Sequence, residues 1–180
     1  RGLIAAQQER WPEARRRFEE GRESVFFFDP LWRARVRAWH AVAALETNDI
    51  GAVQPLVDLV QADSEDPEAL AVAAFAEAGL ADAEGDVQAA IAGYDALTRA
   101  EWTPIQARAL LARTRLEVQE GLVEPDQAVD VLEGLRYRWR GDTVEVQAAA
   151  MLGHVYAEAG RFDDALATMA AARARFPDSP

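Results

Sequence analysis

Few residues in this chain have the types and spacing that chemistry requires. The histidines His40 and His154 lie far apart, and the chain has no cysteine, so we expect no metal site. The carboxylates Asp82, Glu84 and Asp86 are close enough in sequence to form an acid/base pair or a cation site. They surround an expected turn between helices, where solvated charges and a helix N-cap are the ordinary use of acidic residues. We therefore expect no enzymatic activity, no catalytic residue and no cofactor.

A second pattern alternates cations with aromatic rings, in the stretch Arg136-Tyr-Arg-Trp-Arg140. Aromatic rings can stack on nucleic-acid bases while Arg binds phosphates. The stretch also falls at an expected helix C-terminus, where Arg interacts favourably with the helix dipole. The net charge of −12 opposes binding to phosphate backbones. Single-stranded RNA binding is therefore the least favoured interpretation, and no nucleic-acid partner is expected.

The composition predicts an all-α chain. Half of the residues are hydrophobic, many of them Ala, and long helix-forming side chains surround them. β-Branched residues do not alternate with polar ones as they do in strands. No hydrophobic run approaches the roughly 18 residues of a membrane span, so we expect no membrane insertion by this segment. Because the chain has no cysteine, its sequence fits both a reducing and an oxidising compartment, so both cytoplasm and periplasm are consistent with it.

The charged residues carry information on origin and on self-association. All nineteen basic residues are Arg, which with the many Ala indicates a GC-rich, bacterial genome. The chain opens on Arg1 rather than Met, and we expect it to be part of a longer protein. Residues 46–101 hold thirteen acids against Arg99 alone, whereas residues 1–40 hold nine Arg against six acids. The arginines at positions 15–17, and those at 33, 35 and 37, could complement the acidic middle of a neighbouring molecule, so homo-oligomerisation or a spacer role is an alternative function.

Helix start signals recur with a period of about 37 residues. Each consists of a residue whose side chain can cap a helix N-terminus, followed by a proline that suits the first helical turn. The pairs are Asp29-Pro30, Asp66-Pro67 and Thr103-Pro104, and one further step reaches Gly141-Asp142. Gln106 and Glu145 lie three residues after Thr103 and Asp142, as in a capping box. The spacing predicts a series of similar helix pairs.

Turn signals divide each repeat into two helices, because Gly or Asn is favoured where a helix ends in a left-handed residue. The expected turns are 47–49, 84–86, 121–125 and 159–161. The expected helices are 30–46, 50–62, 67–83, 87–99, 104–119, 125–137, 143–158 and 162–175. They form one unit over residues 1–180, with half a hairpin at 1–23 and hairpins at about 30–62, 67–99, 104–137 and 142–177. The aromatic stretch 24–29 is expected to be a non-helical connector wedged between hairpins, with an exposed contact as the alternative.

The last hairpin, residues 142–177, has small and bulky residues at fixed positions. They are Leu152, Gly153, Tyr156, Gly160, Ala165, Met169, Ala172 and Pro177. This order resembles the tetratricopeptide repeat (TPR), although Ala149 and Met169 stand where that pattern prefers aromatic residues. The resemblance implies a right-handed α-solenoid of antiparallel hairpins, a TPR-like superhelix. The period of about 37 residues is longer than the usual 34 of the family.

Resemblance to TPR proteins also implies a function. Such proteins bind a peptide or protein segment in the concave groove lined by the first helix of each pair, so we expect a non-enzymatic protein-interaction scaffold. Trp39, Phe75 and Met151 would be apolar anchors, and Arg108 and Arg115 would pair with carboxylates. The full set of groove positions is Arg35, Trp39, Val42, Phe75, Gly79, Asp82, Arg108, Leu111, Arg115, Gln147, Met151 and His154.

Overall fold

The computed structural model describes residues 1–99, 103–139 and 143–177. In these ranges the chain forms ten α-helices, one short 3₁₀ helix and no β-strand, which confirms the all-α prediction. The helices gather into two compact units, residues 1–106 and residues 107–180. Each unit has its own core, and the single solenoid expected from the sequence stays a prediction.

The helix bounds follow the sequence signals closely. In the first unit lie α1 (Gly2–Gln7), α2 (Trp11–Glu20), the 3₁₀ helix η1 (Ser24–Phe27), α3 (Pro30–Glu46), α4 (Ile50–Asp63), α5 (Pro67–Glu84) and α6 (Val87–Thr98). Then follow α7 (Thr103–Gln119), α8 (Pro125–Arg138), α9 (Thr143–Glu158) and α10 (Phe162–Arg175). Eight of these agree with the expected ranges to within one residue at each end. The start of the chain differs, because residues 1–23 form two helices in contact rather than half a hairpin, and residues 24–27 are helical.

The expected N-caps are present at two of the repeat starts. Asp29 Oδ1 accepts a hydrogen bond from the Leu31 N–H at 3.0 Å, and Asp66 Oδ2 accepts one from the Ala69 N–H at 3.0 Å. The capping-box partners have other roles. The Gln106 side chain donates to the Thr98 carbonyl at 2.5 Å, and Glu145 is buried with its Oε1 3.2 Å from Arg175 Nε. The expected cap at Gly141-Asp142 lies outside the described residues.

All four of the expected turns contain a left-handed residue. They are Asn48 (φ 60°), Gly85 (φ 82°), Gly121 (φ 64°) and Gly160 (φ 74°). Because a side chain at positive φ crowds the following carbonyl, these positions favour Gly, or Asn, over other residues. The turn prediction is therefore confirmed, and its physical basis is local.

This backbone requirement can be measured at Gly85. Replacing Gly85 by Ala is expected to lower the free energy of unfolding by about 1 kcal/mol. The same substitution at Gly134, which lies inside α8 with open space around the added methyl group, is expected to raise it by about 0.5–1 kcal/mol. Urea unfolding followed by far-UV circular dichroism measures both. Equal signs for the two variants would contradict the left-handed assignment.

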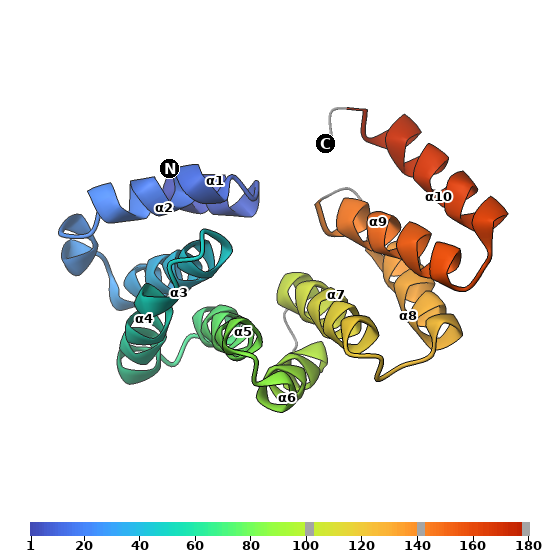
Figure 1. Ribbon diagram of the computed structural model, residues 1–180. Coiled ribbons are helices and arrows are strands. Elements are labelled where there is room, and N and C mark those ends of the chain that lie inside the picture. The colour runs from blue at the N-terminus through green and yellow to red at the C-terminus, as the bar shows by residue number, and fades with distance from the viewer. Residues whose placement is uncertain (100–102, 140–142, 178–180) are drawn as a thin grey trace. The chain divides into compact units, whose positions relative to one another are not determined.

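Helix α3 is the centre of the first unit. It contacts α1, α2, η1, α4 and α5, and Figure 1 shows α3, α4, α5 and α6 side by side. Its residues from 36 to 44 are all buried, as expected of a helix surrounded by others. Helices α3 and α5 pack closely. A Cβ added at Gly79 of α5 would overlap the side chain of Leu45 on α3. Small residues thus bring these helices together.

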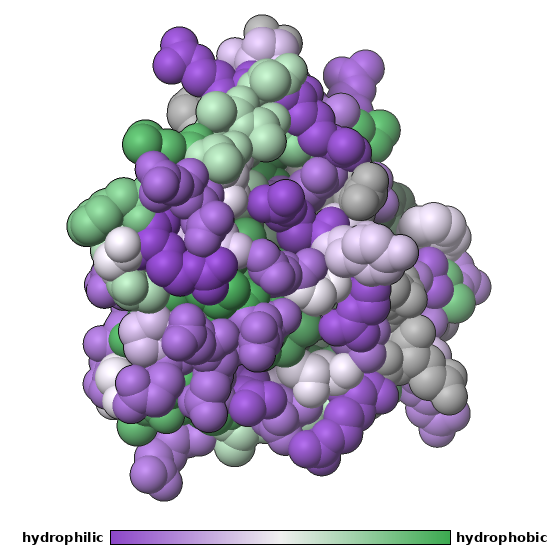
Figure 2. Space-filling view, turned by 90° about the vertical axis from the view of Figure 1, so that its right-hand side faces the viewer, coloured by the Kyte–Doolittle hydropathy of each residue, from purple (hydrophilic) through white to green (hydrophobic). Residues whose placement is uncertain are grey.

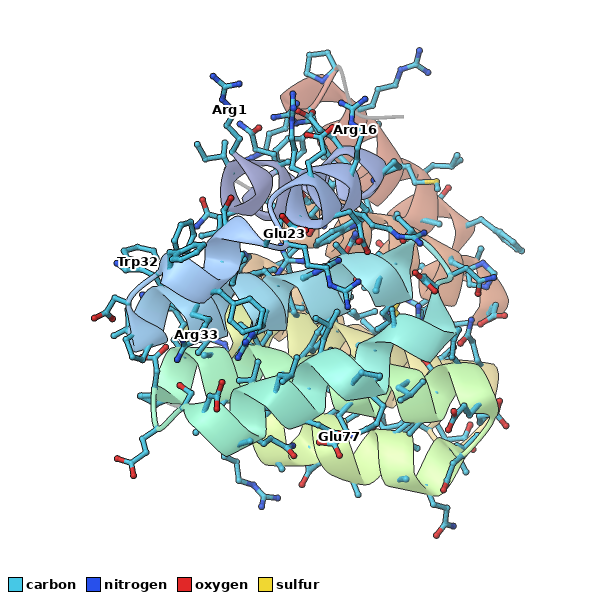
Figure 3. All side chains as sticks on the ribbon, turned by 90° about the vertical axis from the view of Figure 1, so that its left-hand side faces the viewer. Arg1, Arg16, Glu23, Trp32, Arg33 and Glu77 are labelled. Carbon is cyan, nitrogen blue, oxygen red and sulfur yellow. The ribbon has the colours of Figure 1, made fainter. Side chains whose placement is uncertain are left out.

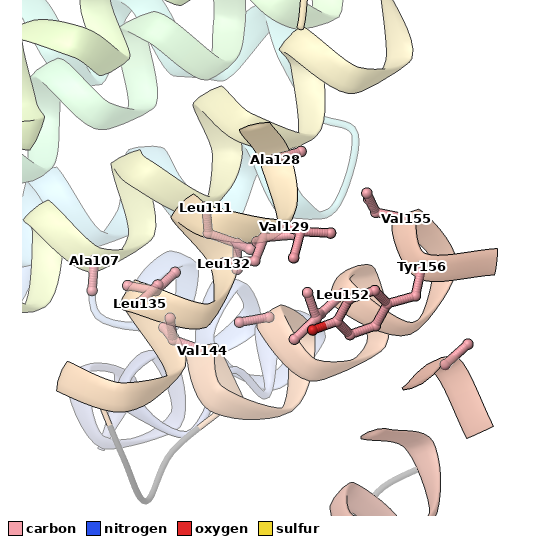
Figure 4. Packing of buried hydrophobic residues seen from close by; sticks show 12 residues of the cluster. Ala107, Leu111, Ala128, Val129, Leu132, Leu135, Val144, Leu152, Val155 and Tyr156 are labelled. Carbon is pink, nitrogen blue, oxygen red and sulfur yellow. The ribbon is translucent and has the colours of Figure 1, made fainter. Parts of the chain in front are cut away.

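The second unit has a core of leucine, valine and alanine side chains. Its cluster is drawn from α7, α8, α9 and α10, with Leu132 and Val155 fully buried (Figure 4). Tyr156 closes one side of this core, and its hydroxyl donates a hydrogen bond to Glu133 Oε1. Burial, together with this carboxylate, raises the pKa of Tyr156 to about 12. The tyrosine is therefore a neutral structural residue.

Candidate functional site

An apolar pocket of about 340 Å³ lies in the first unit. Helices α2, η1, α3 and α4 all contribute side chains to its wall. The apolar lining residues are Phe18, Val25, Phe26, Val36, Ala52, Pro55, Leu56 and Leu59, and the polar ones are Glu19, Arg22, Arg37 and His40. Mostly apolar walls with a few polar groups, at a volume of roughly 300–1,000 Å³, are typical of binding pockets. Sequence analysis missed this site, because its residues come from four elements with no shared motif.

His40 is the buried polar group of the pocket. The centroid of its ring lies 5.3 Å from that of Phe18, on the preceding helix α2. Its Nε2 lies 3.3 Å from Glu19 Oε1 and has no hydrogen-bond partner among the described residues. Burial lowers the pKa of His40 below its usual value, although Glu19 acts in the opposite direction. Burial thus favours the neutral form of the imidazole, whose Nε2 lies beside the Glu19 carboxylate.

Within the aromatic segment, residues 26–28, the side chain of Phe26 lines this pocket. Phe26 and Phe27 are 70% and 90% exposed, and Phe28 is also exposed. The expectation that this triplet is wedged between hairpins is therefore wrong. Phe28 and Trp32 line a second hollow, and Val36 borders both hollows. Figure 3 shows Trp32 projecting away from the ribbon. The triplet is thus exposed, and its role as a contact stays a prediction.

Most arginines near the start of the chain are paired with acids of the same unit. Arg35 binds both oxygens of Asp66, at 2.9 and 3.1 Å, and Arg37 Nη1 lies 2.6 Å from Asp63 Oδ2. Arg15 pairs with Asp49. These arginines therefore complement the acidic middle of their own chain, and are not free to complement that of a neighbour.

The pair of Arg35 with Asp66 predicts a pH-dependent stability. Hydrogen bonds from Arg35 hold the pKa of Asp66 below its usual value. The pairing therefore stabilises the fold above the ordinary pKa of Asp, and this contribution is lost as the pH falls through the lowered pKa. Asp66→Asn keeps a good N-cap but removes the charge, so its deficit in unfolding free energy should be largest at pH 7 and vanish in acid.

Urea unfolding at a series of pH values measures this deficit. Asp66→Ala serves as the matched variant, since it also loses the cap and should cost about 1 kcal/mol more at every pH. If Asp66→Asn lowers the free energy of unfolding by the same amount at every pH, the ion pair contributes nothing to stability.

The predicted groove positions of the first unit are mostly core residues. Trp39, Val42 and Phe75 are buried, and the guanidinium of Arg35 is held by two carboxylates, Asp66 and Glu68. The Phe75 ring packs against that of Tyr94, with centroids 5.6 Å apart. The apolar side chains expected to anchor a partner thus stabilise this unit instead. Asp82 is half-buried and Gly79 is buried.

The predicted groove positions of the second unit differ among themselves in solvent exposure. Leu111 is buried in the core, whereas Met151 and Arg108 are half-buried. The exposed positions are Arg115, Gln147 and His154. His154 Nε2 lies 3.3 Å from Glu158 Oε1, four residues further along α9. Because the groove would draw on both units, its existence as one surface stays a prediction.

The cation and aromatic stretch at the end of α8 does not form a stacking platform among the described residues. Tyr137 is exposed, but Trp139 packs against the core of the second unit. Arg138 Nε donates to the Gly134 carbonyl at 3.3 Å, so this arginine closes the last turn of its helix. Arg140 lies outside the described residues. These placements favour the structural interpretation of the stretch.

Helix α10 exposes a stripe of large apolar side chains. Phe162, Leu166 and Met169 lie at the i, i+4 and i+7 spacing of one helix face and are exposed, whereas Ala165 and Thr168 are buried. Figure 2 shows that hydrophilic residues cover most of the face drawn there, with hydrophobic residues in patches between them. An exposed apolar stripe is a candidate contact surface.

Two other kinds of site are absent from the described part of the chain. No group of three or more acidic or histidine residues there could hold a metal ion. No helix there is both long enough and apolar enough to cross a lipid bilayer. The comparisons with family models, with curated proteins and with solved structures find no match to this chain.

Proposed function

We propose that this chain is a non-enzymatic helical-repeat protein that binds a protein or peptide segment. The 37-residue spacing of its helix starts and the TPR-like order of its last hairpin support a solenoid of antiparallel hairpins, right-handed as in TPR proteins. The observation that carries the function is the exposure of Phe26, which lines an apolar pocket, and of its chain neighbour Phe27. Large exposed aromatic side chains next to a hollow are typical of protein-binding surfaces.

The proposed binding surface lies at α2, η1, α3 and α4 of the first unit. It consists of the pocket, which Phe26 lines, and of the neighbouring exposed Phe27. The concave groove expected from the TPR resemblance stays a second possibility for its exposed positions, Gln147 and His154 among them. It has few apolar anchors, because Trp39 and Phe75 are buried.

A pull-down from lysate of the source organism tests the proposal. The baits are the wild-type chain, a Phe26→Ser/Phe27→Ser variant, and Leu122→Ser as a control for removing an exposed apolar side chain elsewhere. We expect a partner that is recovered with wild type and with the control, and that is lost from the double variant. Equal recovery with all three baits would place the binding surface elsewhere.

Self-association is the second candidate, and the stripe on α10 favours it. Phe162, Leu166 and Met169 would be covered in a dimer. Sedimentation velocity of wild type and of Leu166→Glu tests this candidate. It predicts a dimer that the substitution dissociates. A wild-type monomer at all accessible concentrations would exclude it.

A further inference from the structure

We infer that α10 pairs with α10 of a second copy of this chain, in antiparallel orientation, through its exposed apolar stripe. This inference rests on the self-association put forward above and adds the geometry of the pair. The stripe consists of Phe162, Leu166 and Met169, and the next position on the same helix face is Arg173, which is also exposed. These four side chains form the proposed contact face.

The spacing along this face is that of a helix that packs along another helix. Steps of four, three and four residues separate its members, as in the seam of a coiled coil. In an antiparallel pair with two-fold symmetry, each residue faces the one that lies equally far from the axis on the other copy. An axis between positions 167 and 168 brings Leu166 opposite Met169 of the second copy, and the contact occurs twice. Burial of this apolar surface from water stabilises the pair.

The two ends of the face favour the antiparallel orientation. The same axis brings Arg173 of one copy opposite Phe162 of the other, where a guanidinium is attracted to the face of the ring. Asp163 follows Phe162 in the first turn of α10, and Arg173 lies in the last turn. An antiparallel pair therefore joins an acid and a base at each end, whereas a parallel pair would bring like charges together.

The charges of α10 indicate why a second copy fits this face. Asp163 and Arg173 form no ion pair with any described residue. The other charged residues of the helix and its cap are paired inside the second unit, Arg161 with Asp164 at 2.8 Å and Arg175 with Glu145 at 3.2 Å. One unmatched acid at the start of the helix and one unmatched base at its end make the face complementary to itself.

Sedimentation equilibrium of charge-reversal variants tests the inference, at about 50 mM salt because higher salt screens exposed charges. The variants are Asp163→Arg and Arg173→Asp, measured singly and as an equimolar mixture, together with Leu166→Glu. Asp130→Arg is the matched control, since Asp130 is exposed on α8 and also has no ion pair among the described residues. Circular dichroism checks that each variant folds. Asp163→Asn or Arg173→Gln replaces a charge reversal that does not fold.

We expect a wild-type dimer whose Kd rises at least about tenfold with each charge reversal alone, because the like-charged contact then occurs twice in the dimer. A neutral replacement should raise the Kd about threefold. The equimolar mixture of the two reversals should recover the wild-type Kd, since each variant supplies the charge that the other has lost. The control should change the Kd by less than about twofold.

Two results would overturn the antiparallel pair but leave self-association through the stripe standing. They are a dimer that Leu166→Glu dissociates but the charge reversals do not weaken, and one that the mixture does not restore. A wild-type monomer at every accessible concentration, or a dimer that Leu166→Glu leaves intact, would overturn both. Binding of a peptide at the first unit is tested by the pull-down and does not depend on these results.

Discussion

Replacing Phe75 by alanine is expected to lower the free energy of unfolding by about 3–5 kcal/mol. Phe75 is 8% exposed, and its ring is tilted by 51° against that of Tyr94. The substitution removes the ring from the core and leaves a cavity between α5 and α6 that the packed helices can only partly fill. The measurement is urea unfolding followed by far-UV circular dichroism.

Phe27→Ala is the matched control for this loss. It makes the same chemical change at a side chain that is 90% exposed, so stability should change by no more than about 0.5 kcal/mol. The comparison also decides between two roles of Phe75. If Phe75→Ala is as stable as wild type and instead loses the partner, Phe75 is a groove anchor and our assignment of it to the core is wrong.

The second large effect is expected in the other unit, at Leu132. This residue is fully buried within the cluster formed by α7, α8, α9 and α10 (Figure 4). Leu132→Ala should lower the free energy of unfolding by about 3 kcal/mol, through lost burial and the cavity left behind. Urea unfolding followed by far-UV circular dichroism measures this loss.

Leu122→Ala is the control, because Leu122 is exposed in the turn before α8. It should behave as wild type. A Leu132→Ala variant with unchanged stability would mean that this cluster does not hold the second unit together. Similar losses for both variants would mean that burial does not govern stability in this unit.

Local signals along the chain suffice to predict the helices of this protein. Helix starts at Asp29 and Asp66, and helix ends at Asn48, Gly85 and Gly160, were predicted correctly because each depends on atoms within a turn or two of the chain. A side chain that bonds the N–H two or three residues ahead acts in the same way whatever the rest of the protein does. The all-α class follows from these signals together with composition.

Which side chains are available for function depends on how the helices pack together. Trp39 and Phe75 were expected to be exposed anchors, but several helices cover them, whereas the triplet that was expected to be buried, residues 26–28, is open to solvent. The choice of ionic partners is equally non-local, since Arg35 binds an aspartate 31 positions away. Burial and pairing depend on how several helices pack at once, and a one-dimensional pattern gives the faces of a helix but not the neighbours that cover them.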